Sequence, residues 1–396
     1  MAELSLRKKR LVFVSSTRAD WGLLSPLARA LRDTAPELDV AVVATNMHLL
    51  PEYGMTVDEI RADGFSPFCA DMSVPGADEA SRVRALAKCT AAMADAFTVL
   101  EPDAVVLLGD RYEILGVASA AALMNIPILH IAGGEISEGA VDDSIRHAVT
   151  KLSTLHLTAT EQYRQRVIQL GEEPSRVINT GAIGVWNAIN QPKLPASVLE
   201  AFLGIPLYEE PVAVITYHPA TLDSQASPAA RVRMMLDALD DFPELYCVIT
   251  YPNNDARSDG IISEIERFAA GRPNAIAVKS LGMRRYLSLL SYADICIGNS
   301  SSGIVEVPSF HIPTVDIGIR QRGRIAAKSV VHCGDSREEI SAAIRHALSP
   351  EMARLLPSVE NPYFKPDTLG MQVRAVRDFA ASLPCAPKKF YDIPDL

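Results

Sequence analysis

Short apolar runs that alternate with amphipathic or alanine-rich stretches constrain this chain more than any other feature. In the first half these runs have the length of strands, and several are apolar on both faces, as in the buried strands of a parallel sheet. They cover residues 11–16, 40–45, 104–109, 126–131, 156–160 and 177–180. Because helical stretches separate them, the pattern predicts a doubly wound α/β sheet.

The same alternation starts again after a break. Residues 189–210 contain three prolines and no strand-like run, which indicates a linker. Strand-like runs then recur at 212–217, 245–251, 275–279, 294–297, 314–317 and 330–332. A chain of 396 residues is also too long for one compact α/β core.

The break defines the predicted domains. We predict two Rossmann-like α/β domains, over 1–190 and 191–370, and a closing helix with a tail over 371–396 that can return to the first domain. Ligands prefer the interface between two such domains, so a ligand cleft is expected there.

Composition narrows the class of protein. With 48% hydrophobic and 22% charged residues the chain is typical of soluble globular proteins. No apolar run reaches the roughly 18 residues that span a bilayer, and the apolar start at 11–14 is too short for a secretion signal. The six cysteines have no metal-ligand spacing, which favours reduced thiols in a cytoplasmic protein. A net charge of −10 argues against nucleic acid as the main partner.

Acidic residues follow two of the predicted strands. Asp110 comes directly after the run at 104–109, and Glu135 follows the run at 126–131 through two glycines. The carboxyl ends of strands face the ligand crevice in open α/β sheets, so both carboxylates are candidate catalytic groups. Arg111 lies beside Asp110 and is a candidate substrate ligand.

A helix then begins at Asp142 and Asp143. His147 lies four residues after Asp143, hence on the same helix face, and we expect it near the substrate. One of the two aspartates is a candidate acid or base. The alternative is that they form an ordinary helix cap and an ordinary ion pair with Arg146.

The first two strands deliver further candidates. Residues 16–22 follow the first strand and lack the GxGxxG pattern of a dinucleotide-binding loop. Arg18 offers a planar fork suited to a phosphate or carboxylate, and Asp20 either orients it or caps the following helix, which is expected over 23–32. His48 follows the second strand and is a third candidate.

In the second half, a strand runs into a serine-rich turn at the start of a helix. Ser300, Ser301 and Ser302 combine hydroxyls with free backbone N–H groups and the positive end of a helix dipole, a pattern typical of anion sites. Glu306 is placed to accept hydrogen bonds from a ribose diol. A plain serine cap is the alternative for the turn. His218 follows the strand at 212–217 and is a further candidate catalytic group, and Arg320 contributes local positive charge.

These residues lie within motifs that resemble the UDP-N-acetylglucosamine 2-epimerases, and within them the hydrolysing branch. The similar segments are TRADWGLLSPL (17–27), NMHLLPEYGMTVDEI (46–60), LLGDRYEIL (107–115), HIAGGEISEGAVDDSIRHAVTKL (130–152), YHP (217–219), YPNNDA (251–256), IGNSSSGIVEVPSF (297–310) and IRQRGR (319–324). They run in order through most of the chain. The non-hydrolysing branch typically carries Thr-Arg-Pro-Glu where this chain has Thr17-Arg18-Ala19-Asp20.

The resemblance implies a glycosyltransferase-B-like fold and a two-step reaction. The nucleotide leaves C1 of the sugar as a base takes the C2 proton, and water then adds to the resulting 2-acetamidoglycal with inversion at C2. Neither a metal nor another cofactor is implied. Relatives accept UDP-N-acetylglucosamine, a UDP-linked 2,4-diacetamido-2,4,6-trideoxy sugar or a GDP-linked sugar, and assemble as homodimers or homotetramers.

Residue by residue, the resemblance gives roles to the candidates. Asp110, Glu135 and one of Asp142 and Asp143 look like the acid–base set. The residues that look like the family's nucleotide-diphosphate site are His218, Arg18, Ser300, Ser301 and Glu306. Asn253 and Asn254 are expected near the base of the nucleotide. The alternatives are a non-hydrolysing epimerase, a retaining glycosyltransferase of the same fold and a non-catalytic nucleotide-sugar sensor, which could lack the carboxylates.

Overall fold

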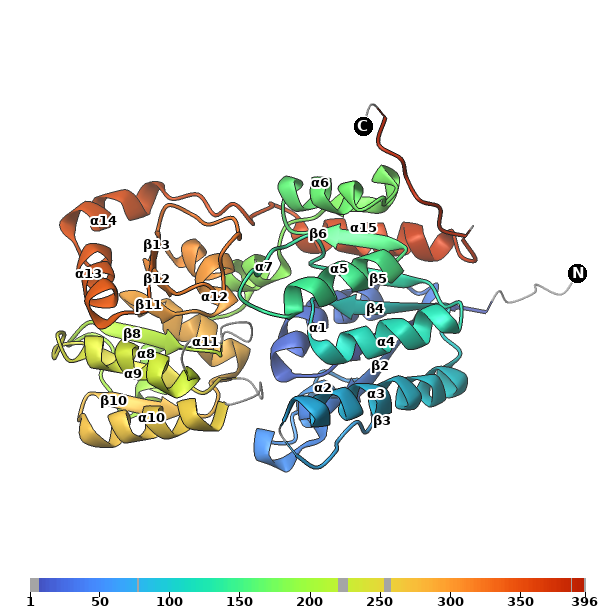
Figure 1. Cartoon of the computed structure of the whole chain (residues 1–396). Coiled ribbons are helices and arrows are strands. Elements are labelled where there is room, and N and C mark those ends of the chain that lie inside the picture. Colours follow the sequence, from blue (N-terminus) through green and yellow to red (C-terminus); the bar gives the residue numbers. More distant parts are fainter. Residues whose placement is uncertain (1–6, 77, 220–226, 253–257, 386, 395–396) are drawn as a thin grey trace, which may run out of the picture. The chain divides into compact units, whose positions relative to one another are not determined.

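The computed structural model describes residues 7–76, 78–219, 227–252, 258–385 and 387–394. It divides the chain into two compact units (Figure 1). The first consists of Met1–Glu135, Asp142–Ile183 and Lys365–Leu396, and the second of Ile136–Val141 and Gly184–Phe364. The short segment Ile136–Val141 therefore leaves the first unit to pack with the second. None of the described helices is long and apolar enough to cross a membrane.

The first unit is built on a seven-stranded parallel sheet with the order β3-β2-β1-β4-β5-β6-β7. Its strands are β1 (Lys9–Ser15), β2 (Leu38–Thr45), β3 (Phe68–Ala70), β4 (Ala104–Leu108), β5 (Ile128–Ile131), β6 (Leu155–Thr158) and β7 (Val177–Asn179). The edge strand β3 was not predicted from the sequence. The order reverses between β1 and β4, and ligands of doubly wound sheets bind at the carboxyl ends of the strands at such a switch point.

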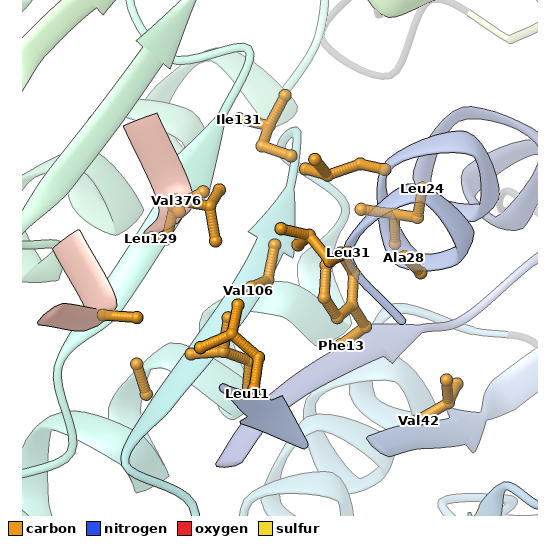
Figure 2. Close-up of a cluster of buried hydrophobic side chains, with 14 of the residues drawn as sticks. Leu11, Phe13, Leu24, Ala28, Leu31, Val42, Val106, Leu129, Ile131 and Val376 are labelled. Atoms are coloured by element: carbon orange, nitrogen blue, oxygen red, sulfur yellow. The ribbon is translucent and has the colours of Figure 1, made fainter. Parts of the chain in front are cut away.

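Helices cover both faces of this sheet (Figure 1). They are α1 (Arg18–Thr34), α2 (Val57–Ala62), α3 (Glu79–Leu100), α4 (Tyr112–Leu123), α5 (Asp142–Leu152), α6 (Glu161–Gln169) and α15 (Thr368–Ala381), with short 3₁₀ turns η1 (Asn46–Leu49), η2 (Pro51–Tyr53) and η3 (Pro174–Arg176). Side chains of β1 alternate between the faces. Leu11 and Phe13 pack with α1, as Figure 2 shows, whereas Val12 and Val14 pack with α3 and α4.

The last helix belongs to the first unit. Helix α15 packs on α1, and Val376 enters the same apolar cluster as Leu11 and Phe13 (Figure 2). Phe379 is buried in that cluster as well. The C-terminal segment therefore completes the core that the N-terminal strands begin.

The second unit contains a six-stranded parallel sheet with the order β10-β9-β8-β11-β12-β13. Its strands are β8 (Val212–Thr216), β9 (Tyr246–Thr250), β10 (Ala275–Val278), β11 (Ile295–Gly298), β12 (Thr314–Ile317) and β13 (Val330–Cys333). The helices are α7 (Ile183–Asn190), α8 (Ala196–Leu203), α9 (Pro228–Leu239), α10 (Ser258–Gly271), α11 (Gly282–Leu290), α12 (Ser301–Val305), α13 (Arg337–Ala347) and α14 (Pro350–Leu355), with 3₁₀ turns η4 (Val307–Phe310) and η5 (Leu356–Ser358). Here the order reverses between β8 and β11.

Two expectations about helices were wrong. The segment 189–210 is not a linker, because it contains α8, whose Leu199 and Leu203 are buried in the core of the second unit. The boundary between the units lies at Ile183–Gly184. Helix α1 begins at Arg18 and not at residue 23, because Thr17 caps it and Asp20 completes a capping box.

Candidate active site

In the first unit, the switch point between β1 and β4 gathers the acidic candidates around one buried arginine. Arg146 lies on α5 with a side chain that is 1% exposed. Its guanidinium forms an ion pair with Asp110 and lies 3.5 Å from Asp143 Oδ1. It also donates a hydrogen bond of 2.9 Å to the backbone oxygen of Glu135. We call Asp110, Glu135, Asp143, Arg146 and His147 the Arg146 cluster.

The geometry of α5 explains why Asp143 belongs to this cluster. Residues three and four apart share a helix face, so Asp143 lies beside both Arg146 and His147. His147 Nε2 is 3.6 Å from Asp143 Oδ2. Burial lowers the pKa of His147 in spite of this neighbouring carboxylate, which favours a neutral imidazole at neutral pH. Asp142 occupies the first position of the helix and is half-buried.

Glycines and a buried histidine set the backbone conformation just before Asp110 and Glu135. Gly109 has a φ of +73°, and its carbonyl oxygen lies 2.8 Å from Nε2 of His130. Burial lowers the pKa of His130 to about 3, so this histidine is neutral and structural. Gly134, with a φ of +79°, lies so close to the Tyr163 carbonyl oxygen that a Cβ would overlap it. The backbone can therefore turn Glu135 into place only with glycine before it.

A second buried acid, Glu113, was missed in the sequence. Its side chain is fully buried at the start of α4 and accepts hydrogen bonds from Arg111 Nε at 2.8 Å and Asn46 Nδ2 at 3.0 Å. Burial alone would raise the pKa of Glu113, but the Arg111 charge and hydrogen bonds bring it below its usual value. An acid in the first turn of a helix usually stays in solvent, so only its spacing from Arg111 hinted at this pair.

Asp20 and Arg18, the candidates that follow β1, differ in their contacts. Asp20 accepts hydrogen bonds from the backbone of Ser16 and Thr17 at 3.2 and 3.0 Å, so it caps α1. Burial raises the pKa of Asp20, and the Arg111 charge opposes this rise. Arg18 is partly exposed and lies 3.5 Å from Glu59.

His48 is a core residue in this structure. It is fully buried, and its ring nitrogens lie 2.9 Å from Ser15 Oγ and 2.8 Å from Thr56 Oγ1. Burial lowers its pKa to about 4. Both ring nitrogens of His48 are engaged inside the protein, and its expected role as a substrate ligand stays a prediction.

In the second unit, Asn299 organises the switch point between β8 and β11. Its side chain, which is 1% exposed, accepts a hydrogen bond from the His218 backbone N–H at 2.7 Å and donates one to the His218 carbonyl at 2.8 Å. The Asn299 carbonyl in turn accepts hydrogen bonds from Arg320 at 3.0 Å and Gln321 at 2.8 Å. Asn299, absent from the predicted set, thus connects His218 to Arg320.

The three serines that follow have distinct environments. Residues 299–302 form what we call the serine turn. Ser300 caps α12 by accepting a hydrogen bond from the Ser302 N–H, while Ser301 is exposed. Ser302 Oγ accepts a hydrogen bond of 2.8 Å from the buried Tyr286 hydroxyl. Glu306 follows α12 and packs so closely on Gly184 that a Cβ at Gly184 would overlap the carboxylate.

Two further points concern ligands. Asn253 and Asn254, expected near a base, lie outside the described residues. Among the described residues no group of histidine, cysteine, aspartate or glutamate has the arrangement of a metal site.

A protein-family model described as UDP-N-acetylglucosamine 2-epimerase matches residues 29–377. The chain belongs to this family. It is 36% identical to the polysialic acid biosynthesis protein P7 of Escherichia coli, over 98% of each chain. It is 37% identical to the GDP/UDP-N,N'-diacetylbacillosamine 2-epimerase (hydrolyzing) of Campylobacter jejuni, over 82% of this chain and 84% of the relative.

Solved structures of epimerases share the fold. The UDP-GlcNAc 2-epimerase of Neisseria meningitidis, solved with UDP-GlcNAc bound, superposes with a TM-score of 0.79 at 17% identity over 93% of this chain and all of that one. The S. aureus MnaA–UDP structure gives a TM-score of 0.78 at 15% identity over 96% of this chain and 100% of that one. The predicted architecture of two parallel-sheet α/β domains, of the glycosyltransferase-B-like kind, is confirmed.

Proposed function

We propose that this member of the epimerase family is a hydrolysing nucleotide-sugar 2-epimerase. Its substrate is UDP-N-acetylglucosamine or a UDP- or GDP-linked 2-acetamido relative, and its products are the free N-acetylmannosamine-type sugar and the nucleoside diphosphate. The observation that carries the proposal is the Arg146 cluster, in which Asp110 and Asp143 share one buried arginine at a strand-order switch point. Relatives at 37% and 32% identity are named as hydrolysing diacetylbacillosamine 2-epimerases, which supports the hydrolysing branch.

In this proposal the first unit supplies the acid–base groups. A carboxylate of the set Asp110, Glu135 and Asp143 removes the C2 proton. The C2–H electron pair forms the C1=C2 double bond, and the C1–O bond breaks with its pair going to the departing diphosphate. The C2 proton is only weakly acidic, so a positioned base and stabilisation of the leaving group are both required. Water then adds its oxygen to C1 and gives one proton to a carboxylate of this set, and an acid protonates C2 on the face opposite to that from which the first proton left.

The second unit binds the nucleotide in this proposal. Phosphate oxygens are bound by Ser300 and Ser301 at the start of α12, with help from His218 and Arg320. Glu306 accepts hydrogen bonds from the ribose. Arg18 and Arg111 of the first unit supply cations for the diphosphate. No further cofactor takes part in the proposed chemistry.

Two other reactions compete with this proposal. A non-hydrolysing epimerase returns the sugar to the nucleotide, and one relative, from Neisseria meningitidis, is named simply UDP-N-acetylglucosamine 2-epimerase. A retaining glycosyltransferase requires an acceptor and does not need a carboxylate cluster such as that around Arg146. Assembly as a homodimer or homotetramer and a cytoplasmic location are part of our proposal.

Incubation of the purified protein with candidate donors tests the function. We expect UDP-N-acetylglucosamine, its 2,4-diacetamido-2,4,6-trideoxy counterpart or a GDP-linked relative to release free sugar and nucleoside diphosphate, as followed by NMR. Product that stays on the nucleotide would assign the chain to the non-hydrolysing branch. Turnover that requires an added acceptor would identify a transferase.

A further inference from the structure

The far end of α5 is held by residues from the C-terminus of the chain. Lys388 Nζ lies 2.6 Å from the carbonyl oxygen of Lys151, 2.7 Å from that of Ser153 and 3.5 Å from that of Thr150. The last carbonyls of a helix lack partners within the helix and carry partial negative charge. An ammonium group with three donors suits such a helix end, and here it comes from more than 230 residues later in the chain.

A buried carboxylate completes the arrangement. Glu172 has a side chain that is 3% exposed, and it lies 2.7 Å from Lys388, 2.7 Å from Lys151 and 3.0 Å from His156 Nε2. Burial would raise the pKa of Glu172, but its hydrogen bonds to His156 and the two lysines bring it below the usual value. A charge this deeply buried needs such partners, so Lys388 is bound by more than surface electrostatics.

The residues after Lys388 extend the contact. The Phe390 ring lies against Gly171, where a Cβ would overlap it, and the Lys151 ammonium lies 4.8 Å from its centroid. Tyr391 donates a backbone hydrogen bond of 3.0 Å to the Gly171 carbonyl and packs on the apolar cluster of Val167, Ile168 and Val177. In Figure 1 the red tail accordingly passes beside α6. We call residues 387–391 the C-terminal strap.

The helix that the strap holds carries one of the proposed acid–base groups, Asp143. Asp143, Arg146 and His147 lie on the first turns of α5, and Lys388 binds the carbonyls at its end. Ile145 and Val149 hold one face of the helix in the core, and Lys388 adds a contact at its C-terminal end.

We propose that Lys388 is a positioning residue for the epimerase reaction, through which the C-terminal strap fixes α5 and thereby the carboxylate of Asp143. The functional part of this inference rests on the proposed function. The structural part, that the strap stabilises α5, does not.

The adjacent lysine provides a matched control. Lys389 is exposed, whereas Lys388 is bound, so Lys388→Gln and Lys389→Gln remove the same charge from neighbouring positions. In the full-length protein we expect Lys388→Gln to speed hydrogen–deuterium exchange of residues 142–152 by about tenfold, in line with losing a charged group at a helix end. Lys389→Gln should leave this exchange at the wild-type rate.

Kinetics separate positioning from a general loss of fold. For Lys388→Gln we expect kcat to fall by roughly tenfold, with KM within about twofold of wild type, because Asp143 acts in the chemical step and not in nucleotide binding. Phe390→Ala loosens the strap but keeps Lys388, so kcat should fall less than in Lys388→Gln while KM again stays near the wild-type value. This variant replaces Lys388→Gln if Lys388→Gln does not fold.

The outcomes are distinct. Wild-type exchange in α5 of Lys388→Gln, or faster exchange with an unchanged kcat, would overturn the positioning role. If the wild-type protein turns over no nucleotide sugar, the proposed function fails while the exchange experiment still decides whether the strap holds α5.

Discussion

The Arg146 cluster and the serine turn lie at equivalent strand-order switch points but are held in different ways. In the first unit, carboxyl side chains are arranged around a guanidinium that is 1% exposed. In the second unit, the contacts are made by the Asn299 amide, backbone groups and hydroxyls. The cluster therefore depends on charge, whereas the turn depends mainly on hydrogen bonds between neutral groups, with Arg320 as a charged donor to the Asn299 carbonyl.

This difference suggests that the first unit serves proton transfer and the second unit serves phosphate binding. Carboxylates beside a buried cation suit proton transfer, in which charge changes during the reaction. Neutral donors at a helix start suit a phosphate, which carries the same charge before and after binding. We expect charge-removing substitutions in the first unit to affect the chemical step and substitutions in the second unit to affect binding.

The largest expected effect is on the acids themselves. Asp110→Asn, Glu135→Gln and Asp143→Asn should each lower kcat by roughly 10²–10⁴-fold, the usual contribution of an acid–base group. Asp142→Asn, made beside Asp143→Asn, shows which of the two aspartates takes part in proton transfer, and steady-state kinetics beside thermal unfolding distinguish catalysis from folding. Near-wild-type turnover in both Asp110→Asn and Glu135→Gln would remove the catalytic assignment.

The next prediction concerns stability and tests whether the first unit depends on paired charges. Glu113→Gln leaves the partly buried Arg111 without its carboxylate, so we expect a loss of about 3 kcal/mol in the free energy of unfolding, measured with urea. The control is Glu338→Gln, an exposed acid in the first turn of α13, which should change stability by less than about 0.5 kcal/mol. Equal losses in the two variants would show that the Arg111–Glu113 pair contributes no more to the free energy of unfolding than an exposed acid does.

The smallest effect is expected in the second unit. Ser301→Ala and Glu306→Gln should each weaken UDP binding by roughly two- to tenfold, the value of one hydrogen bond, and should raise KM more than they lower kcat. Calorimetry with UDP measures the affinity directly. Unchanged affinity in both variants would reduce the serine turn to a helix cap.

The fold was accessible from the sequence to a large extent because buried parallel strands are continuous apolar runs. The exceptions have physical reasons. Strand β3 is a three-residue edge strand with an exposed Cys69, too short for a period to show. Helix α8 was hidden by prolines, yet Pro195 is its N-cap residue, where proline does not interrupt the helical hydrogen bonds.

The site was accessible in part. Asp110 and Asp143 were predicted to lie close together because strand ends and helix starts mark them, and their carboxylates do lie around one arginine. Glu113 and Asn299 were given no role, and Arg146 only that of an ordinary ion-pair partner, because a fully buried polar side chain cannot be told from a surface one until its partners are placed. His48 had the same signal as a ligand, and its burial places it in the core.

The central claim is elimination followed by addition of water, and isotope incorporation from solvent tests it most directly. With the preferred donor in heavy water containing oxygen-18, we expect the released sugar to carry deuterium at C2 and oxygen-18 at its C1 hydroxyl. The reason is that C2 is reprotonated from the opposite face and C1–O cleavage expels the diphosphate intact. A released sugar without deuterium at C2, or with oxygen-18 in the diphosphate instead, would contradict the account.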